Sequence, residues 1–363
     1  MKTCGIKPLS IVALLSMGLL TGCLFEGEQS MEEMDAPPEE EEATSTDTIS
    51  EETESDGEDI EGEEGEEEEG ETTGSVQREL YLLDSNGMVV PQTIELPASK
   101  EVASQALEYL VKDGPVTELL PSGFGAVLPA GTQIQGVNLK EDGTAIVDVS
   151  KEFEEYQAED EEAILQAMTY TLTQFESVKS IKLWINGYEQ DTMPVSGTPI
   201  TGGVSRSNGI NLQESAVNDL VNSEPVTVYY PSQQDGQEVY QVPVTTRVTD
   251  QEDLYTSVVQ TLLNGPDLGT SLLQPFNDGA EVSNTELNDG VLTVTFNEAL
   301  LTGEETKALS DEALASLVMS LTNLPDVESV DIKVDGVEQV MNEAGELLSE
   351  PVTQTDVQNA KSL

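Results

Sequence analysis

The stretch 178–187 reads VKSIKLWING, and the stretch 327–336 reads VESVDIKVDG. In both, apolar residues alternate with polar ones as on a half-buried β-strand. Each stretch ends in Asn-Gly or Asp-Gly, the dipeptides that favour a tight turn. Two such similar strands in one chain raise the question of whether a whole domain is present twice.

The elements before these strands also occur twice, in the same order. Each copy begins with two apolar runs around a turn, continues with an amphipathic helix that ends at Gly-Pro, and then has a second hairpin, a second helix and the final strand. The paired turn and helix-end dipeptides are Asn86-Gly87 and Asp235-Gly236, Gly114-Pro115 and Gly265-Pro266, and Asp142-Gly143 and Asp289-Gly290.

This order predicts an α+β fold with two tandem β-β-α-β-β-α-β domains, each with two helices packed on a small sheet. Each copy is expected to fold alone. The predicted boundaries are a lipoprotein signal peptide at 1–22, a lipidated cysteine and acidic disordered tether at 23–77, domain 1 at 78–200, a linker at 201–223, domain 2 at 224–350 and a C-terminal tail at 351–363.

The charge of the chain is strongly negative, with a formal net charge of −57. Residues 24–77 contain 24 acidic residues and no Lys or Arg, a composition typical of an extended, disordered spacer. Binding to nucleic acid needs clustered basic residues, so this balance excludes nucleic acid as a partner. Whether the acidic tract binds cations is left open, although it has no calcium-loop spacing.

The residue types also restrict the chemistry. The chain has no histidine, and its only cysteines are Cys4 and Cys23. This removes the Ser-His-Asp and Cys-His arrangements and the commonest zinc ligands from the folded part. We therefore predict no catalytic residues, no cofactor and no metal site.

A few residues recur or stand out in ways that could indicate chemistry. Asp142 and Asp289 recur, but Asp before Gly is the expected turn residue. Asp148 lies on the polar face of a strand and corresponds to Thr295, so a catalytic role would not be present in both copies. Trp184, the lone tryptophan, corresponds in this alignment to the aliphatic Ile332 or Val334, which predicts a packing role. The pair Gly123 and Gly125 forms no nucleotide-binding pattern.

The N-terminus has the features of a targeting segment. Lys2 and Lys7 precede a short apolar run, too short to span a bilayer comfortably. The run ends in Leu20-Thr21-Gly22-Cys23, which resembles the bacterial lipobox, in which cleavage before the cysteine follows its diacylation. We therefore predict cleavage between Gly22 and Cys23 and lipidation of Cys23.

The ordered combination of lipobox, acidic spacer, Gly-Pro helix ends, Asp-Gly hairpins and final strands resembles the GerM-like sporulation and spore germination lipoproteins. The repeat of that family is called the GerMN domain. The resemblance implies a fold similar to the ring-building motif of secretion-system rings. It also implies a place in the complex between mother cell and forespore, and it brings no catalytic or ligand-binding residues.

The main hypothesis is a non-enzymatic, lipid-anchored assembly protein on the outer face of the cytoplasmic membrane, in the intermembrane space around the forespore during sporulation. Its partners would be the membrane, through the anchor, and other sporulation membrane proteins or itself in a ring. A helix layer would then pack on the sheet of a neighbour. One alternative is an extracytoplasmic binding module for peptidoglycan or a small ligand, and the other is a carboxylate-dependent cell-wall hydrolase.

The lipobox predicts the effect of one substitution. Cys23→Ala should abolish labelling with radioactive palmitate and release the chain from membranes or leave it uncleaved, because no thiol remains to carry the acyl chains. Cys4→Ala is the matched control and should leave labelling unchanged. Unaltered labelling and membrane retention of Cys23→Ala would contradict the prediction.

Overall fold

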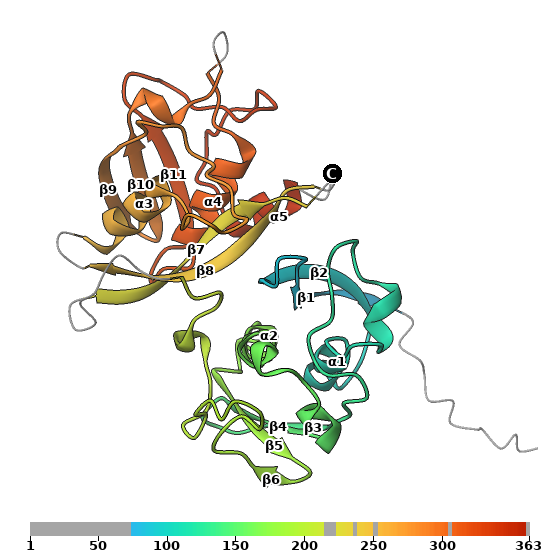
Figure 1. The fold of residues 1–363 in the computed structure, drawn as a ribbon. Helices are drawn as coiled ribbons and strands as arrows, with labels where there is room; N and C mark the ends of the chain where they lie inside the picture. Colours follow the sequence, from blue (N-terminus) through green and yellow to red (C-terminus); the bar gives the residue numbers. More distant parts are fainter. Residues whose placement is uncertain (1–73, 214–222, 235–237, 250–252, 304–306, 361–363) are drawn as a thin grey trace, which may run out of the picture. The chain divides into compact units, whose positions relative to one another are not determined.

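The alternating strands and amphipathic helices form two similar domains in the computed structural model (Figure 1). The structure describes residues 74–213, 223–234, 238–249, 253–303 and 307–360. Cys23, Gly22 and the Asp235-Gly236 turn therefore lie outside the described residues. Residues 68–363 form one compact unit that contains both domains.

The first domain has the predicted order of elements. Its helices and strands are β1 (Ser75–Leu83), β2 (Val89–Pro97), α1 (Val102–Glu108), β3 (Ile134–Leu139), β4 (Thr144–Val149), α2 (Glu161–Leu172), β5 (Ser180–Ile185) and β6 (Tyr188–Glu189). Strands β3 and β4 form an antiparallel hairpin, and β5 lies parallel to β4, with α2 as the connection between them. The strand order in this sheet is β3-β4-β5-β6.

The second domain repeats this arrangement. Its elements are β7 (Ser223–Ser232), β8 (Tyr240–Thr249), α3 (Leu254–Asn264), β9 (Val282–Asn288), β10 (Val291–Phe296), α4 (Asp311–Leu321), β11 (Ser329–Val334) and α5 (Gln354–Ala360). Its sheet has the order β11-β10-β9, with β10 and β11 parallel. The predicted α+β class and the tandem architecture are confirmed.

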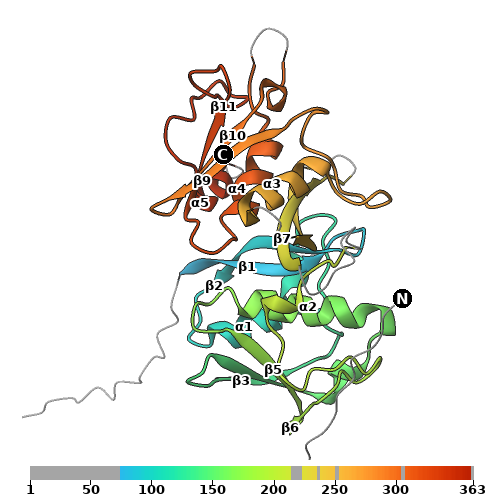
Figure 2. The same cartoon turned by 90° about the vertical axis from the view of Figure 1, so that its left-hand side faces the viewer.

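Each domain also has a third layer, formed by its first hairpin. The hairpins β1-β2 and β7-β8 are separate two-stranded sheets. Helix α2 contacts both β1 and β5, and α4 contacts both β7 and β11, so each central helix lies between a hairpin and a sheet (Figures 1 and 2). Nine consecutive residues of α4, from Ala313 to Leu321, are buried. A helix that is buried on all sides has no free face for a neighbouring subunit.

The edges of the hairpins are capped by hydroxyl side chains of the central helices and by an amide side chain just after α2. The N–H of Tyr81 donates to Thr171 Oγ1 at 3.0 Å, and in the second domain the N–H of Tyr229 donates to Ser320 Oγ at 2.8 Å. Gln174 donates to the carbonyl of Glu79 at 2.7 Å. An unpaired strand edge invites association with other chains, so these side chains make β1 and β7 poor templates for further pairing.

The segment predicted as a linker contributes to the first core. Val204 pairs with Ile181 of β5 through two backbone hydrogen bonds, and both Val204 and Ile210 are buried. Arg206 stacks on the Tyr170 ring at 4.8 Å. The apolar residues of this Gly- and Ser-rich segment therefore complete the domain. The predicted tail likewise contains α5, whose Val357 is buried in the second core.

This packing predicts that fragment 74–213 is more stable than fragment 74–200. The shorter fragment loses burial of Val204, which at the usual value for one buried aliphatic side chain amounts to about 1.5–3 kcal/mol of unfolding free energy. Urea denaturation of the two fragments measures this difference. Equal midpoints and slopes would show that 201–213 adds nothing to the domain.

Candidate functional site: the contact between the two domains

The carboxylates considered above as catalytic candidates, Asp142, Asp148 and Asp289, have structural roles in turns. Asp142 Oδ1 accepts a hydrogen bond from the N–H of Thr144 at 2.9 Å, and this bond lowers the pKa of Asp142 below its usual value. Asp148 Oδ1 accepts from the N–H of Gly187 at 3.0 Å and so braces the turn after β5. Asp289 has a φ of 48°, as its place before Gly290 in a tight turn requires.

The proposed counterpart of Trp184 is corrected by the strand register. Asp148 pairs with Trp184, and its equivalent Thr295 pairs with Lys333. Trp184 therefore corresponds to Lys333 and not to Ile332 or Val334. The side chains of Ile332 and Val334 are buried on the helix side of the sheet, whereas Trp184 lies half-buried on the opposite face. Alternation along the strand separates the two faces.

No other pattern from the sequence brings groups together for chemistry. Among the residues that the structure describes, no three His, Cys, Asp or Glu side chains are grouped as a metal site would require. In the same part of the chain, no helix is long and apolar enough to cross a bilayer. Within domain 1, the buried carboxylate of Glu161 accepts hydrogen bonds from Tyr156, Ser196 and Thr198 and so holds its own domain together. A second set of polar groups converges between the two domains.

The first element of this contact is an extended segment that runs along β8. The N–H of Thr245 donates to the carbonyl of Ile210 at 2.8 Å, and the N–H of Gln213 donates to the carbonyl of Thr245 at 3.1 Å. The N–H of Ile210 also donates to Thr245 Oγ1 at 3.0 Å. The end of the first domain thus pairs with a strand edge of the second.

Asn211 joins this segment to both hairpins. Its Oδ1 accepts from the N–H of Val89 at 2.9 Å. Its Nδ2 donates to the carbonyls of Val89 at 2.7 Å and Pro243 at 2.8 Å. Asn211 has a φ of 46°, in the left-handed region that Asn tolerates better than most residues. One amide group therefore satisfies backbone groups of β2 in domain 1 and β8 in domain 2.

A second link joins the turn after β1 to the start of β8. The hydroxyl of Tyr240 donates to Asp84 Oδ2 at 2.8 Å, and both residues are buried. The Tyr240 ring packs edge-on against Phe124, with centroids 5.0 Å apart. Burial and the hydrogen bond to Asp84 both raise the pKa of Tyr240, so the phenol stays protonated and donates at neutral pH.

Apolar and aromatic groups surround these hydrogen bonds. Val90 of β2 is fully buried and belongs to the hydrophobic core of the second domain. Tyr81 and Tyr170 pack at 5.3 Å between ring centroids. Burial raises the pKa of Tyr229, with a further contribution from the negative charge of Glu79, which is partly offset by Arg206. The charges of Glu79 and Arg206 in the first domain thus act on the buried Tyr229 of the second.

This contact was not predicted, because the composition of 201–223 is that of a linker. The pattern that could have indicated it is Gly209-Ile210-Asn211, where an apolar residue and a turn-prone Asn interrupt a polar stretch. Such a residue can bond to the backbone of a neighbour as well as to its own. Its partners lie far away in the sequence, so their identity is visible only in the structure.

Comparison with known proteins agrees with the duplication. The family model described as "Germane: Sporulation and spore germination" matches residues 79–191 and again 227–340. The chain belongs to this family.

One relative and the solved structure of its domains extend the match beyond single domains. The spore germination protein GerM of Bacillus subtilis (strain 168) is 44% identical over 354 residues, which cover 96% of each chain. The solved structure of the tandem GerMN domains of GerM from Bacillus subtilis matches with a TM-score of 0.71 and 48% identity, covering 77% of this chain and 98% of that one. The predicted family is thus confirmed, and the fold of the two described domains is that of tandem GerMN domains.

The geometry of Asn211 predicts a loss of stability on substitution. Asn211→Gly keeps the left-handed backbone accessible but removes three side-chain hydrogen bonds, so unfolding free energy should fall by about 2–4 kcal/mol. Proteolysis between the domains should also become faster. Urea denaturation and limited proteolysis of the full chain measure both effects.

Asn186→Gly is the matched control, because Asn186 has a similar φ of 49° in a turn remote from the domain contact. It should change unfolding free energy by less than about 1 kcal/mol, since turn residues that adopt left-handed backbone tolerate Gly. Equal losses for the two variants would show that Asn211 does not join the domains.

Proposed function

We propose that this member of the sporulation and spore germination family is a non-enzymatic assembly protein. It is anchored through Cys23 on the outer face of the cytoplasmic membrane and joins a complex between mother cell and forespore. The observation that carries the proposal is the domain contact around Asn211, which makes one binding body of two domains. Polar groups converge there to hold backbone segments together, and none of them is arranged around an open reacting centre.

Because each domain has three layers, the surfaces that it can offer to partners differ from those of the ring-building motif. The resemblance to ring-building motifs suggested a helix layer against a neighbouring sheet. In each domain the central helix is covered by the domain's own hairpin, so this contact is not available to α2 or α4. The surfaces left for partners include the outer faces of the two sheets, the strand edges, the space between the hairpins and the unburied sides of α1 and α3.

The outer faces of the two sheets differ in chemistry. The first carries the half-buried Ile146 and Trp184, whereas the equivalent positions of the second are Thr293 and Lys333. Asp331 in the second sheet pairs with Lys333 at 2.9 Å. Two different exposed faces suit contacts with two different surfaces, either on two partner proteins or head to tail between copies of this chain.

The proposal is tested by complementation in an endospore-forming host that lacks its own chain of this family. The wild-type chain should restore heat-resistant spores, and so should Asp142→Asn and Asp148→Asn, because these carboxylates only brace turns. Spore counts at equal protein level are the measurement. A wild-type chain that reaches the membrane without restoring spores would contradict the assembly role, and loss of spores with a stable, folded Asp148→Asn would favour the hydrolase alternative.

A further inference from the structure

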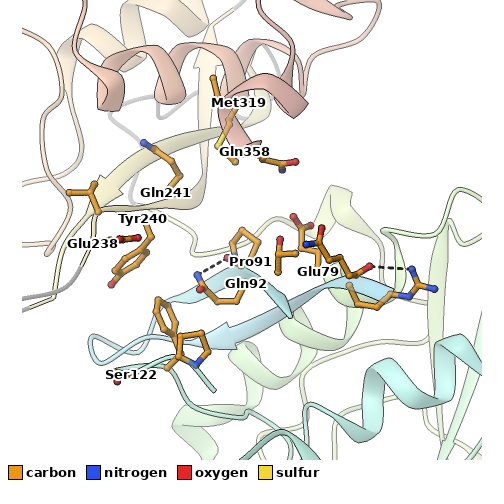
Figure 3. Close-up of a pocket in the computed structure, with 16 residues that line it drawn as sticks. Glu79, Pro91, Gln92, Ser122, Glu238, Tyr240, Gln241, Met319 and Gln358 are labelled. Carbon is orange, nitrogen blue, oxygen red and sulfur yellow. Dashed lines mark hydrogen bonds between the residues drawn. The ribbon is translucent and has the colours of Figure 1, made fainter. Parts of the chain in front are cut away.

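A cleft of about 860 Å³ opens between the two hairpins, beyond the Asn211 contact (Figure 3). In Figure 3 the labelled residues Pro91 and Gln92 of β2 lie on one side, and Tyr240 and Gln241 of β8 lie on the other. The volume is in the range of ordinary ligand sites. What distinguishes this cleft is that a strand edge borders it on each side.

On the side of domain 1, the bordering edge is that of β2. In the hairpin, the N–H groups of Tyr81 and Leu83 point away from β2, to Thr171 and Gly125. The residues opposite them, Pro91 and Val89, therefore direct their backbone groups away from β1 as well. Thr93, paired with Glu79, has the same orientation and is exposed along the cleft.

On the side of domain 2, the bordering edge is that of β8. Thr245 directs its backbone N–H and C=O to the segment 210–213, and the carbonyl of Pro243 accepts from Asn211. Gln241 is the next residue with this orientation, and it lines the cleft. From the Asn211 contact, the chain of β2 runs into the cleft through Pro91 and Thr93. The chain of β8 passes Gln241 first and then runs toward the contact. The two edges therefore border the cleft with opposite chain directions.

We propose that this cleft binds an extended, uncharged polypeptide segment of a partner protein, which adds as a strand between β2 and β8. The site continues a contact that the chain already makes with itself. Residues 210–213 lie between the same two strand edges, next to the cleft. They make backbone hydrogen bonds to β8 and side-chain hydrogen bonds to β2. Backbone pairing would supply the affinity, and the side chains around the cleft the specificity.

The lining side chains favour an uncharged segment. Three glutamines, Gln77, Gln92 and Gln358, can each donate and accept hydrogen bonds. The side chain of a fourth, Gln241, is buried and bonded to Glu312 and Ser316, so only its backbone can serve the cleft. Phe124 and Met319 provide apolar contacts. Only Arg78, Glu79 and Glu238 carry charge among the lining residues, which is a near balance in a chain with a net charge of −57. A strongly basic or acidic segment would gain little here.

This inference deepens the proposed function by stating how a partner is held. It rests on the proposed role only for the source of the segment, because binding of a peptide in solution is measured without sporulation. Failure of complementation would leave the cleft intact as a peptide site, whereas failure of peptide binding would leave the assembly role intact.

The test begins with a phage-displayed random peptide library, selected on the full chain in mild detergent with counter-selection on Thr93→Pro. The backbone N–H of Thr93 points away from β1. Proline at this position therefore removes a hydrogen-bond donor from the cleft edge without removing a hydrogen bond of the hairpin. Selected peptides are synthesised, and their affinity is measured by fluorescence anisotropy. The control is Glu95→Pro, on the same edge but outside the cleft lining.

The expected result is selection of uncharged, β-prone peptides that bind Thr93→Pro about tenfold more weakly than wild type, the loss of roughly one hydrogen bond. Glu95→Pro should bind them like wild type. Hydrogen exchange of the wild-type chain should show new protection at Thr93 and Gln241 when peptide is added, a readout that does not depend on any variant folding.

Peptides that bind Thr93→Pro and wild type equally, or that leave exchange at Thr93 and Gln241 unchanged, would overturn the proposal. So would a selection that enriches no peptide. Retention of the chain by purified peptidoglycan, unaffected by Thr93→Pro and blocked by Gln92→Ala, would assign the cleft to a glycan instead and would also overturn it.

Discussion

The arrangement of the described residues depends on how the backbone groups at the edges of two hairpins find partners. A two-stranded hairpin leaves outward-pointing N–H and C=O groups on both strands, and buried groups of this kind must be paired. Asn211 pairs them for β2 and β8 at once, with one side-chain amide and three hydrogen bonds. Val90 can be buried in the core of the second domain because the polar backbone beside it is satisfied.

The same requirement explains the composition of the central helices. Helices α2 and α4 are buried between two layers, yet they carry Thr171, Ser316 and Ser320 among apolar residues. Thr171 and Ser320 hold the outward N–H groups of Tyr81 and Tyr229 in equivalent places of the two domains. These polar residues are the means by which each hairpin attaches to its helix, and they leave the central helices without a free face for ring assembly.

Much of this fold could be predicted from the sequence, because each element has a local cause. Asp142-Gly143 and Asp289-Gly290 mark hairpins, as the positive φ of both glycines requires. Helix periodicity and the alternation along β5 and β11 indicate which residues are buried. Because the domain is duplicated, each element is indicated by two separate stretches of sequence.

What could not be predicted depends on partners that are distant in the sequence. The third layer, the role of Asn211 and the cleft between β2 and β8 all involve residues 90 or more positions apart or in different domains, such as Tyr81 and Thr171 or Val89 and Asn211. Register was also a source of error: Trp184 aligns with Lys333, and a shift of one residue places a side chain on the opposite face of the sheet.

The central claim is that the two domains form one body through the contacts of Asn211 and Tyr240. It is tested most directly by pulsed electron paramagnetic resonance between spin labels at the exposed Glu159 and Glu338, one in each domain. The labels are attached to introduced cysteines in a chain in which Cys4 and Cys23 are replaced by serine. The account predicts a single narrow distance distribution that broadens on Asn211→Gly. A broad distribution in the chain with Asn211 intact would contradict it.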